Sequence, residues 1–513
     1  MKLCWAVLLI LGCALHVSAQ HVVVKPYVQP DFSPGSLEKD QKILIWFTDQ
    51  TPGDFTVEFN SAGEKRTAIK PERQPLYFAP AKPAKLRLSN REKPQPPPKL
   101  EISIDTNVVE EAVPFIPEKD QFYFKYTAVL TNLPLDAQIE YRVKLGETIV
   151  RESSFHTRAT PGQSIRFVMV GDLANGKESQ NAIAWQIAQQ HPQFLVGLGD
   201  IVYSAGRMSQ YMSYFWPTYN QPKSEGPATG AALMASVPFH IVLGNHDTEE
   251  GKWPDYPDAL GAYFVFYPAG DGPGIGTWNT PLGKNNVAAA AFRRAVGKAY
   301  PNLACYSFEN GPAHFLVLDS GTYSDMKNPA LLRWIAMDLQ NAKTRWKFVC
   351  FHVPAFQTTK EHYLEQKMRR LEPIFEKWGV DVVFSGHVHN YQRSKPLRFR
   401  PNLAYYPRAK NRVDGFFEVD EQFDGIKKTQ PKGVIHIVSG GGGATLYKMN
   451  YAAMAETLTA EAPGNWVPYT AKFFSDSHSF TLVELEPNQL QLRQLNENGW
   501  ELDRMLITKP ANR

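Results

Sequence analysis

The fold of this chain is decided by a short apolar run that stops at a glycine and an aspartate, Phe194-Leu195-Val196-Gly197-Leu198-Gly199-Asp200-Ile201-Val202-Tyr203. Its first five residues are typical of a buried β-strand, which the Gly-Asp pair ends. The same pattern, a strand followed by Asp, Asn or His, recurs at residues 165–172, 239–247, 346–352 and 380–389. Amphipathic helices are predicted between the strands, at 179–190 and near 364–377. Strands that alternate with helices indicate an α/β layered sheet.

The polar side chains at the ends of these strands form the candidate site. They are Asp172, Asp200, Tyr203, Asn245, His352, His387 and His389. Strand ends of an α/β sheet gather at one edge, where ligand sites form. Carboxylate, amide, phenol and imidazole ligands together suit intermediate divalent or trivalent metals, not a thiolate-loving one. Seven ligands exceed the needs of one ion, so we expect two ions that share a carboxylate and clamp the attacking and leaving oxygens at phosphorus.

Each motif taken alone has a simpler interpretation. A Gly-Asp pair after a strand is commonly a turn, and Gly244-Asn245-His246-Asp247 could be a turn with caps. His387-Val388-His389 could be two surface histidines. Their occurrence together, in this order and each after an apolar strand, favours one shared functional site.

The order of these motifs resembles the metallophosphoesterase (calcineurin-like) superfamily, and more closely its purple acid phosphatase branch. The segments that carry the resemblance are Asp172-Leu173-Ala174, Gly199–Tyr203, Gly244–Asp247, Val349–His352 and Gly386–His389. Tyr203, three residues after the second Asp, is the sign of that branch, whereas most of the superfamily has a His at the position of Ala174. The branch usually has Gly there, so Ala174 would be strained if its φ were positive. Similar segments at 306–319, 389–393 and 434–443 extend the resemblance over most of the chain.

The resemblance implies a role for each ligand. A first metal would be held by Asp172, Tyr203 and His389, a second by Asn245, His352 and His387, with Asp200 as the bridge. In the family the first site takes Fe(III), and the second takes Fe(II), Zn(II) or Mn(II). A hard, anionic phenolate suits a hard trivalent ion. The implied nucleophile is a metal-held hydroxide, because a cation lowers the pKa of bound water.

Three further residues are candidates for catalytic roles. His246 follows the ligand Asn245 and is the natural donor to the phosphate and the leaving-group oxygen. Asp247 could orient the ring of His246. His362 lies in a segment where larger family members place a substrate-contacting His, and a phosphate needs cationic donors around it. The simpler interpretation of His362 is a surface residue at the start of a helix.

The resemblance also implies the architecture. Residues 164–513, with core motifs at 172–389, are expected to form an α/β (α+β) metallophosphoesterase fold, a four-layer β-sandwich flanked by helices. Residues 22–157 are expected to be all-β, because short strands with regular turns are typical of a β-sandwich. This domain is similar to the fibronectin-III-like domain of larger family members. We expect a linker at 158–163 and an exposed loop at Pro94–Pro98.

The N-terminus predicts export. Residues 1–19 have the pattern of a signal peptide, because Lys2 precedes an apolar run that is too short to span a bilayer. The small residues Val17-Ser18-Ala19 fit cleavage before Gln20. We therefore expect a secreted or periplasmic protein without a transmembrane segment, and lipoprotein processing at Cys13 is the less favoured alternative.

Two cysteines would remain after that cleavage, Cys305 and Cys350. Both lie in apolar runs. They could pair in an exported protein, or stay as buried free thiols. The sequence leaves the two possibilities open.

The leading functional hypothesis is an exported binuclear phosphatase of the acid phosphatase type, whose partner is a small phosphate monoester. The alternative is a phosphodiesterase or nucleotidase with the same metals, and a more distant one is a non-catalytic adhesion or binding protein. The net charge of +4 in 513 residues gives no argument for nucleic-acid binding. Long loops at 204–236 and 248–303 could shape the substrate pocket or simply pack on the surface. Their notable residues are Arg207, Trp216, Tyr219, Trp253, Tyr256 and Trp278. The oligomeric state stays open.

Overall fold

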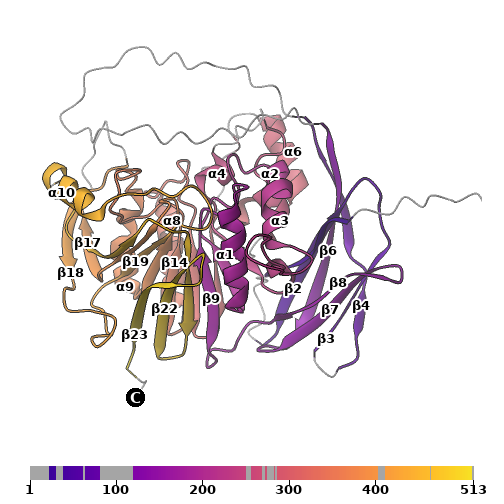
Figure 1. Ribbon diagram of the computed structural model, residues 1–513, viewed down its shortest axis with the longest axis horizontal. Helices are drawn as coiled ribbons and strands as arrows, with labels where there is room; N and C mark the ends of the chain where they lie inside the picture. The colour runs from indigo at the N-terminus through magenta and orange to yellow at the C-terminus, as the bar shows by residue number, and fades with distance from the viewer. Residues whose placement is uncertain are drawn as a thin grey trace, which may run out of the picture.

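The structure is a computed structural model that describes residues 22–30, 38–61, 64–80, 119–249, 256–267, 272–273, 282, 286–297, 299–402, 411–462 and 464–510. The expected signal peptide, with Cys13 and Gln20, lies outside the described residues, as do the Pro94–Pro98 loop, Trp253 and Trp278. Two units lie side by side in Figure 1, the N-terminal unit (residues 22–156) on the right and the α/β unit (residues 165–508) on the left.

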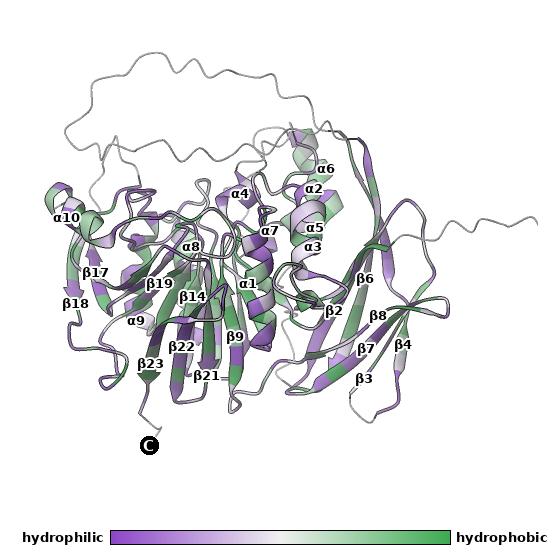
Figure 2. Ribbon diagram, in the orientation of Figure 1, coloured by the Kyte–Doolittle hydropathy of each residue, from purple (hydrophilic) through white to green (hydrophobic). Residues whose placement is uncertain are grey.

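The N-terminal unit consists of two antiparallel four-stranded sheets, β1-β2-β6-β5 and β4-β3-β7-β8. The short strands expected of an all-β unit are found throughout its described residues. The indole of Trp46 stacks on Tyr126 between the sheets, with centroids 5.4 Å apart. Hydrophobic and hydrophilic residues are interspersed along β7, whose outer face meets water (Figure 2). The strands are β1 (Val22–Pro30), β2 (Asp40–Thr48), β3 (Phe55–Ser61), β4 (Thr67–Ile69), β5 (Glu72–Phe78), β6 (Gln121–Leu133), β7 (Gln138–Leu145) and β8 (Thr148–His156).

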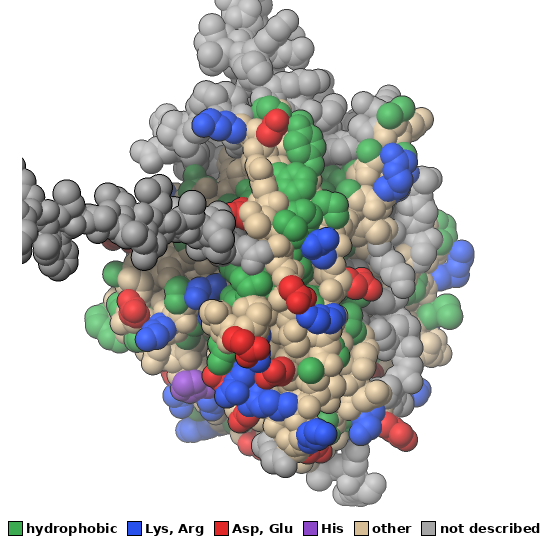
Figure 3. Space-filling model, turned by 90° about the vertical axis from the view of Figure 1, so that its right-hand side faces the viewer, with side chains coloured by type: hydrophobic (Ala, Val, Ile, Leu, Met, Phe, Trp, Pro, Cys, Tyr) green, Lys and Arg blue, Asp and Glu red, His purple; other side chains and the backbone are tan. Residues whose placement is uncertain are grey.

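The outer surface of this unit carries charges of both signs. Figure 3 shows acidic and basic side chains interspersed on the face turned toward the viewer. Several form ion pairs, such as Arg66 with Glu140 at 3.3 Å and, across the neighbouring strands β3 and β7, Lys144 with Glu58 at 3.3 Å. Exposed pairs of this kind contribute little to stability. They give this surface a mixed charge and not a basic one.

The α/β unit is built around two mixed sheets that face each other, β11-β10-β9-β21-β22-β23 and β12-β13-β14-β15-β19-β16-β20. Phe167 and Phe194 of the first sheet meet Phe315 and Phe348 of the second in a shared apolar core. The sheets comprise β9 (Ile165–Val170), β10 (Phe194–Gly197), β11 (Phe239–Ile241), β12 (Tyr306–Asn310), β13 (Ala313–Val317), β14 (Trp346–Cys350), β15 (Val382–Ser385), β16 (Tyr391–Ser394), β19 (Ile435–Ser439), β20 (Thr470–Phe474), β21 (Ser479–Leu485), β22 (Gln489–Asn496) and β23 (Glu501–Thr508). A small hairpin, β17 (Leu397–Pro401) with β18 (Gly415–Val419), lies beside them.

Helices cover the outer faces of both sheets. Helix α1 (Glu178–Gln189), expected at 179–190, packs Ile183 and Ile187 against the six-stranded sheet. Helices α8 (Pro329–Asn341) and α9 (Glu372–Trp378) pack against the seven-stranded sheet. The order helix, sheet, sheet, helix gives an α/β fold with mixed sheets. Helix α10 (Tyr451–Glu461) lies near the β17–β18 hairpin (Figure 1).

The helix predicted near 364–377 is partly wrong. The structure has a 3-10 helix, η3 (Lys367–Leu371), followed by α9, and residues 361–364 form a turn. Pro373 lies in the first turn of α9. Because proline lacks the N–H that a continuing helix needs, α9 begins there.

The two loops expected at 204–236 and 248–303 contain short helices, and the first loop packs against the N-terminal unit. These helices are α2 (Met208–Gln210), η1 (Tyr211–Phe215), α3 (Trp216–Tyr219) and η2 (Leu233–Ala235) in the first loop, and α5 (Ala262–Val265), α6 (Asn286–Val296) and α7 (Ala299–Asn302) in the second. Helix α4 (Asn245–Thr248) lies between the two loops. The ring of Trp216 lies 6.2 Å from that of Tyr27 and 5.3 Å from that of Phe47, both in the N-terminal unit. Tyr219 is fully buried in the same cluster. Of the two roles considered for these loops, Trp216 and Tyr219 therefore take the packing role and do not line a substrate pocket.

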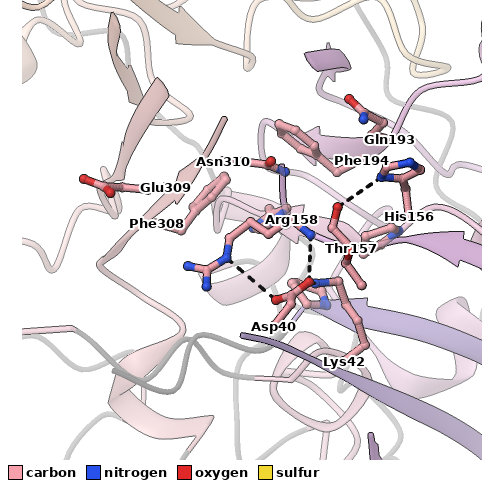
Figure 4. A pocket seen from close by; sticks show the side chains of 13 residues that line it. Asp40, Lys42, His156, Thr157, Arg158, Gln193, Phe194, Phe308, Glu309 and Asn310 are labelled. Atoms are coloured by element: carbon pink, nitrogen blue, oxygen red, sulfur yellow. Dashed lines mark hydrogen bonds and ion pairs between the residues drawn. The ribbon is translucent and has the colours of Figure 1, made fainter. Parts of the chain in front are cut away.

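Buried polar contacts complete this interface. Tyr27 Oη donates to the Val265 carbonyl at 2.7 Å, and Arg151 donates to Asn220 Oδ1 at 2.8 Å. Where the chain passes between the units, Arg158 donates its N–H to Asp40 Oδ2 at 2.8 Å, beside a cavity of only about 20 Å³ (Figure 4). The expected linker is thus held against both units.

Two smaller expectations concern the rest of the chain. Cys305 and Cys350 are buried free thiols and not a disulfide, and burial raises the pKa of Cys305 to about 12. Among the described residues, every helix is too short or too polar to cross a membrane.

Candidate metal centre

The ends of five strands place the predicted ligands at one edge of the α/β unit. Asp172 follows β9, Asp200 follows β10, and Asn245 begins α4 after β11. These three strands are parallel neighbours. His352 follows β14 and His387 follows β15, which are parallel neighbours in the facing sheet. The predicted strands thus bring their carboxyl ends together, as the sequence indicates.

Sharp turns aim the side chains inward. Asp172, Asp200 and His387 have φ values of 60°, 50° and 68°, a left-handed conformation that is costly for residues with a Cβ. The glycines of the motifs make room for these turns. A Cβ on Gly244 would overlap the Asp200 carboxylate, and one on Gly386 would come within 2.7 Å of Asp172 Oδ2. The φ angle of Ala174 is not positive, so its backbone is not strained. Ala174 forms a parallel β-bridge with Val202.

One group of ligands surrounds the phenol of Tyr203. Its Oη lies 2.8 Å from Asp172 Oδ1, 3.1 Å from Asp200 Oδ2 and 3.1 Å from His389 Nε2. His389 Nε2 in turn lies 3.2 Å from Asp172 Oδ1. All four side chains are buried. Four oxygen and nitrogen donors therefore converge within hydrogen-bond distance.

A second group lies on the other side of Asp200. The Asp200 Oδ2 that faces Tyr203 is also 3.2 Å from His352 Nε2. His352 Nε2 lies 3.2 Å from Asn245 Oδ1, and one candidate ligand atom from each of Asp200, His352 and His387 lies within 4.8 Å of the others. Asp200 is therefore the side chain that faces both groups.

Backbone carbonyls fix the orientation of three imidazoles. His352 Nδ1 lies 2.8 Å from the Leu198 carbonyl, and His389 Nδ1 lies 2.7 Å from that of Thr445. His246 Nδ1 lies 2.7 Å from the Ser204 carbonyl. Because each Nδ1 then carries the hydrogen, the Nε2 atoms of His352 and His389 face the cluster as acceptors or ligands.

Burial and charge shift the pKa values of this cluster. Burial alone would raise the pKa of Asp200, but the imidazoles of His352 and His246 hold it well below its usual range. Burial, with Asp172 and Asp200 alongside, raises the pKa of Tyr203 well above its usual range, so the phenol keeps its proton. Cations would neutralise these buried carboxylates and favour the ionised phenol. The donor set of carboxylate, phenol, amide and imidazole thus fits metal ions of intermediate hardness.

The two candidates next to Asn245 take different positions. The ring of His246 lies against that of Tyr203, with centroids 4.4 Å apart and planes tilted by 47°, and its Nε2 lies 3.9 Å from Asp200 Oδ2. Asp247 does not orient this ring in the way expected. Its carboxylate accepts hydrogen bonds from the backbone N–H groups of Ile201 at 3.1 Å and Gly244 at 2.9 Å. Burial, together with the nearby negative charge of Asp200, raises the pKa of Asp247 to about 7. Asp247 therefore holds the loops together, and the Ser204 carbonyl contacts the ring.

His362 lies beside the second group, in a turn and not at the start of a helix. Its ring centroid is 4.1 Å from that of His387, and its φ is 58°. A cavity of about 190 Å³ begins here. It is lined by Asn245, His362, Glu365, His387, Glu249 and Lys367, together with other residues of the same loops.

Sequence reasoning missed two side chains of the site. Glu365 Oε1 lies 2.7 Å from His362 Nδ1, and Tyr447 stacks on His389 at 4.4 Å with an angle of 16°. The His-x-x-Glu spacing of residues 362 and 365 is a signal that could have indicated the first. Tyr447 follows the glycine-rich run at 440–443, which the sequence connects to the site only through the family resemblance.

The chain is similar to calcineurin-like phosphoesterases and to purple acid phosphatases. The family model of calcineurin-like phosphoesterases matches residues 165–391. Purple acid phosphatase 1 of Ipomoea batatas is 26% identical over 298 residues, which cover 55% of each chain. Phosphoenolpyruvate phosphatase of Allium cepa is 26% identical over 389 residues, covering 73% of this chain and 68% of that one. The Fe(3+)-Zn(2+) purple acid phosphatase 12 of Arabidopsis thaliana is 25% identical over 309 residues, covering 58% and 57%. The matches thus span between about half and two thirds of the length of these relatives.

Solved structures agree on the fold. Purple acid phosphatase PPD1 from yellow lupin (Lupinus luteus) seeds has a TM-score of 0.57 at 15% identity, covering 95% of this chain and 74% of that one. PhoD has a TM-score of 0.52 at 13% identity, covering 96% and 93%. At these identities the likeness concerns the fold alone. Together, the matched family model and the curated relatives show that residues 165–391 match calcineurin-like phosphoesterases and that this chain is similar to purple acid phosphatases.

Proposed function

We propose that the protein is a binuclear metal-dependent phosphatase of the acid phosphatase type that hydrolyses phosphate monoesters. The observation that carries this is the position of Asp200, whose Oδ2 lies 3.1 Å from Tyr203 Oη on one side and 3.2 Å from His352 Nε2 on the other. A single carboxylate between two sets of ligands is what a pair of metal ions sharing one bridge requires.

The proposed ligands divide at Asp200. The first ion would be held by Asp172, Tyr203 and His389, the second by Asn245, His352 and His387, with Asp200 common to both. We propose Fe(III) at the Tyr203 site, because a phenolate suits a hard trivalent ion, and Fe(II), Zn(II) or Mn(II) at the other. A relative bears Fe(3+) and Zn(2+) in its name. When bound, the two ions would supply an activated water and neutralise charge at phosphorus.

Two histidines would bind the substrate. His246 has its Nδ1–H at the Ser204 carbonyl, and as the imidazolium it would donate from Nε2 to the phosphate and to the leaving-group oxygen. His362 faces the same centre from the cavity side and would donate to a second phosphate oxygen. Asp247, bonded to the backbone of Ile201 and Gly244, would hold the loops that carry Asp200 and Asn245.

The remaining assignments concern the whole chain. We propose a signal peptide at 1–19 with cleavage before Gln20, and hence a secreted or periplasmic enzyme. We further propose a fibronectin-III-like domain at 22–157 and a catalytic domain at 164–513. The two antiparallel sheets of residues 22–156 support the first of these domains, and the matched residues 165–391 support the second.

The test is a substrate comparison on the chain from Gln20, loaded with iron and then zinc. We expect para-nitrophenyl phosphate to be hydrolysed at acid pH, and bis(para-nitrophenyl) phosphate to be hydrolysed more slowly. Faster cleavage of the diester would replace the monoesterase with a phosphodiesterase. Hydrolysis of neither ester by protein that holds two metals would contradict the proposal.

A further inference from the structure

Glu365 lies between two histidines of the site. Its Oε1 is 2.7 Å from His362 Nδ1, and its Oε2 is 3.4 Å from His387 Nε2. The two rings are 4.1 Å apart at an angle of 51°. Because the side chain of Glu365 is 38% exposed and lines the cavity, it reaches both rings from the solvent side of the site. One carboxylate therefore contacts a predicted metal ligand and a predicted phosphate donor.

This contact determines which nitrogens carry hydrogen. An ionised carboxylate only accepts hydrogen bonds, so the nitrogens that face it must be donors. His387 Nε2 is buried without a hydrogen-bond partner and lies 3.4 Å from Glu365 Oε2, so a small rotation would let an Nε2–H donate to that carboxylate and leave Nδ1 as the nitrogen that ligates. His362 donates its Nδ1–H to Glu365, so it would donate to a phosphate from Nε2 as the imidazolium, which carries hydrogen on both nitrogens.

The backbone already restrains both rings. His387 has a φ of 68°, and its N–H donates to Asp172 Oδ2 at 2.8 Å. His362 also has a positive φ, 58°, within the turn that carries Glu365. What the backbone leaves free is rotation about the side-chain bonds and the choice of tautomer. Carboxylates that accept the distal N–H of a metal-bound histidine fix these two variables.

We propose that Glu365 is a positioning residue that holds His362 as a phosphate donor by accepting its Nδ1–H, and holds His387 as a ligand of the second metal by facing its Nε2 at 3.4 Å. This inference rests on the proposed function. It makes the second metal and the substrate depend on one side chain that is neither a ligand nor a substrate contact. A competing use of the same atoms is an additional cation held by His362, Glu365 and His387, whose candidate ligand atoms lie within 4.8 Å of one another.

The experiment compares Glu365→Ala, Glu365→Gln, His362→Ala and the double variant E365A/H362A in the metal-loaded full chain. Glu309→Gln is the matched control, because Glu309 is 3.6 Å from His314 Nδ1 but lies on β12, away from the site. Three quantities are measured: metal equivalents per chain, the rate at which a chelator removes the second metal, and the affinity for inorganic phosphate. Esterase activity is recorded in parallel.

We expect E365A to lose the second metal about tenfold to a hundredfold faster than wild type and to bind phosphate about tenfold more weakly. H362A should weaken phosphate binding to a similar degree, with wild-type metal retention. The double variant should bind phosphate no more weakly than either single variant, because both disturb the same contact. E365Q, which keeps one acceptor oxygen, should fall between wild type and E365A, and E309Q should match wild type.

Three results would overturn the inference. The first is wild-type metal retention and phosphate affinity in E365A. The second is a fold-loss of phosphate affinity in the double variant that equals the product of the fold-losses in the two single variants. The third is a further metal equivalent in wild type that E365Q loses, which would assign these atoms to a cation. Failure of the proposed function is distinguishable, because it removes ester hydrolysis from wild type while the metal-retention comparison still reports on Glu365.

Discussion

The contact between the two units and the edge that carries the ligands are built in opposite ways. Around Trp216, aromatic rings from both units fill one apolar core, and buried donors such as Tyr27 Oη meet carbonyl oxygens. At the edge, Asp172 and Asp200 are buried carboxylates in left-handed conformations, crowded against imidazoles. Apolar packing stabilises the fold, whereas buried charge and backbone strain cost stability. Substitutions should therefore separate the two regions, with losses of function at one and of stability at the other.

The largest effect is expected for Asp200→Asn. The carboxylate faces both ligand groups, so its loss weakens both ions and should lower kcat/KM by roughly a thousandfold, which is about 4 kcal/mol of transition-state stabilisation. The metal-free variant should also lose stability, because the buried imidazole of His352 loses its carboxylate partner, but this loss should be smaller than the loss of transition-state stabilisation. Steady-state kinetics, metal analysis and urea unfolding measure the three quantities. Full activity in D200N would contradict the assignment of the bridge.

The next substitution should lower stability and leave the metal site intact. Trp216→Ala should lower the free energy of unfolding by about 3–5 kcal/mol, because a large ring that is 5% exposed leaves a cavity between the units. Metal content at saturation should stay at the wild-type value. The matched control is Trp500→Ala, whose ring is 71% exposed and whose loss should cost less than about 0.5 kcal/mol. Equal stability of W216A and W500A in urea would show that this interface does not hold the fold.

A third test uses pH to probe a polar contact outside both regions. Burial alone would lower the pKa of His314, but Asp338 at 2.7 Å, helped by Glu309, raises it from 6.5 to about 8. A raised folded-state pKa means that this stabilisation is complete below pH 6.5 and is lost as the pH rises through 8. The stability difference between wild type and Asp338→Asn should thus shrink by about 2 kcal/mol between pH 6 and pH 9. A difference that is constant across that range would show that the pair does not titrate.

The smallest effect concerns the first motif. Ala174 is buried and does not have a positive φ, so Ala174→Gly should destabilise the protein by about 0.5–1 kcal/mol through the added freedom of the unfolded chain. Thermal unfolding of the metal-free protein gives the sign. A gain in stability would show instead that the alanine is strained and that the site needs glycine there.

The sequence predicts the strand ends of the metal site better than it predicts the interface between the two units. The strand ends are predictable because a short apolar run followed by Gly-Asp is a local pattern. The backbone at residue 244 approaches Asp200 so closely that only glycine fits there. Trp216 could not be placed, because an aromatic residue in a long loop fits a pocket as well as a core. Glu365 was missed because its position depends on how a turn meets the end of β15, and no periodicity reports such a contact.

The central claim is a pair of metals, one of them bound by Tyr203. Its most direct test is the metal content and visible spectrum of the chain from Gln20, in wild type and Tyr203→Phe, after loading with iron and zinc. We predict about two metals per chain, one of them iron, with an absorption band that Y203F loses while its second metal remains. Wild-type protein that holds no metal after loading, or an unchanged band in Y203F, would contradict the account.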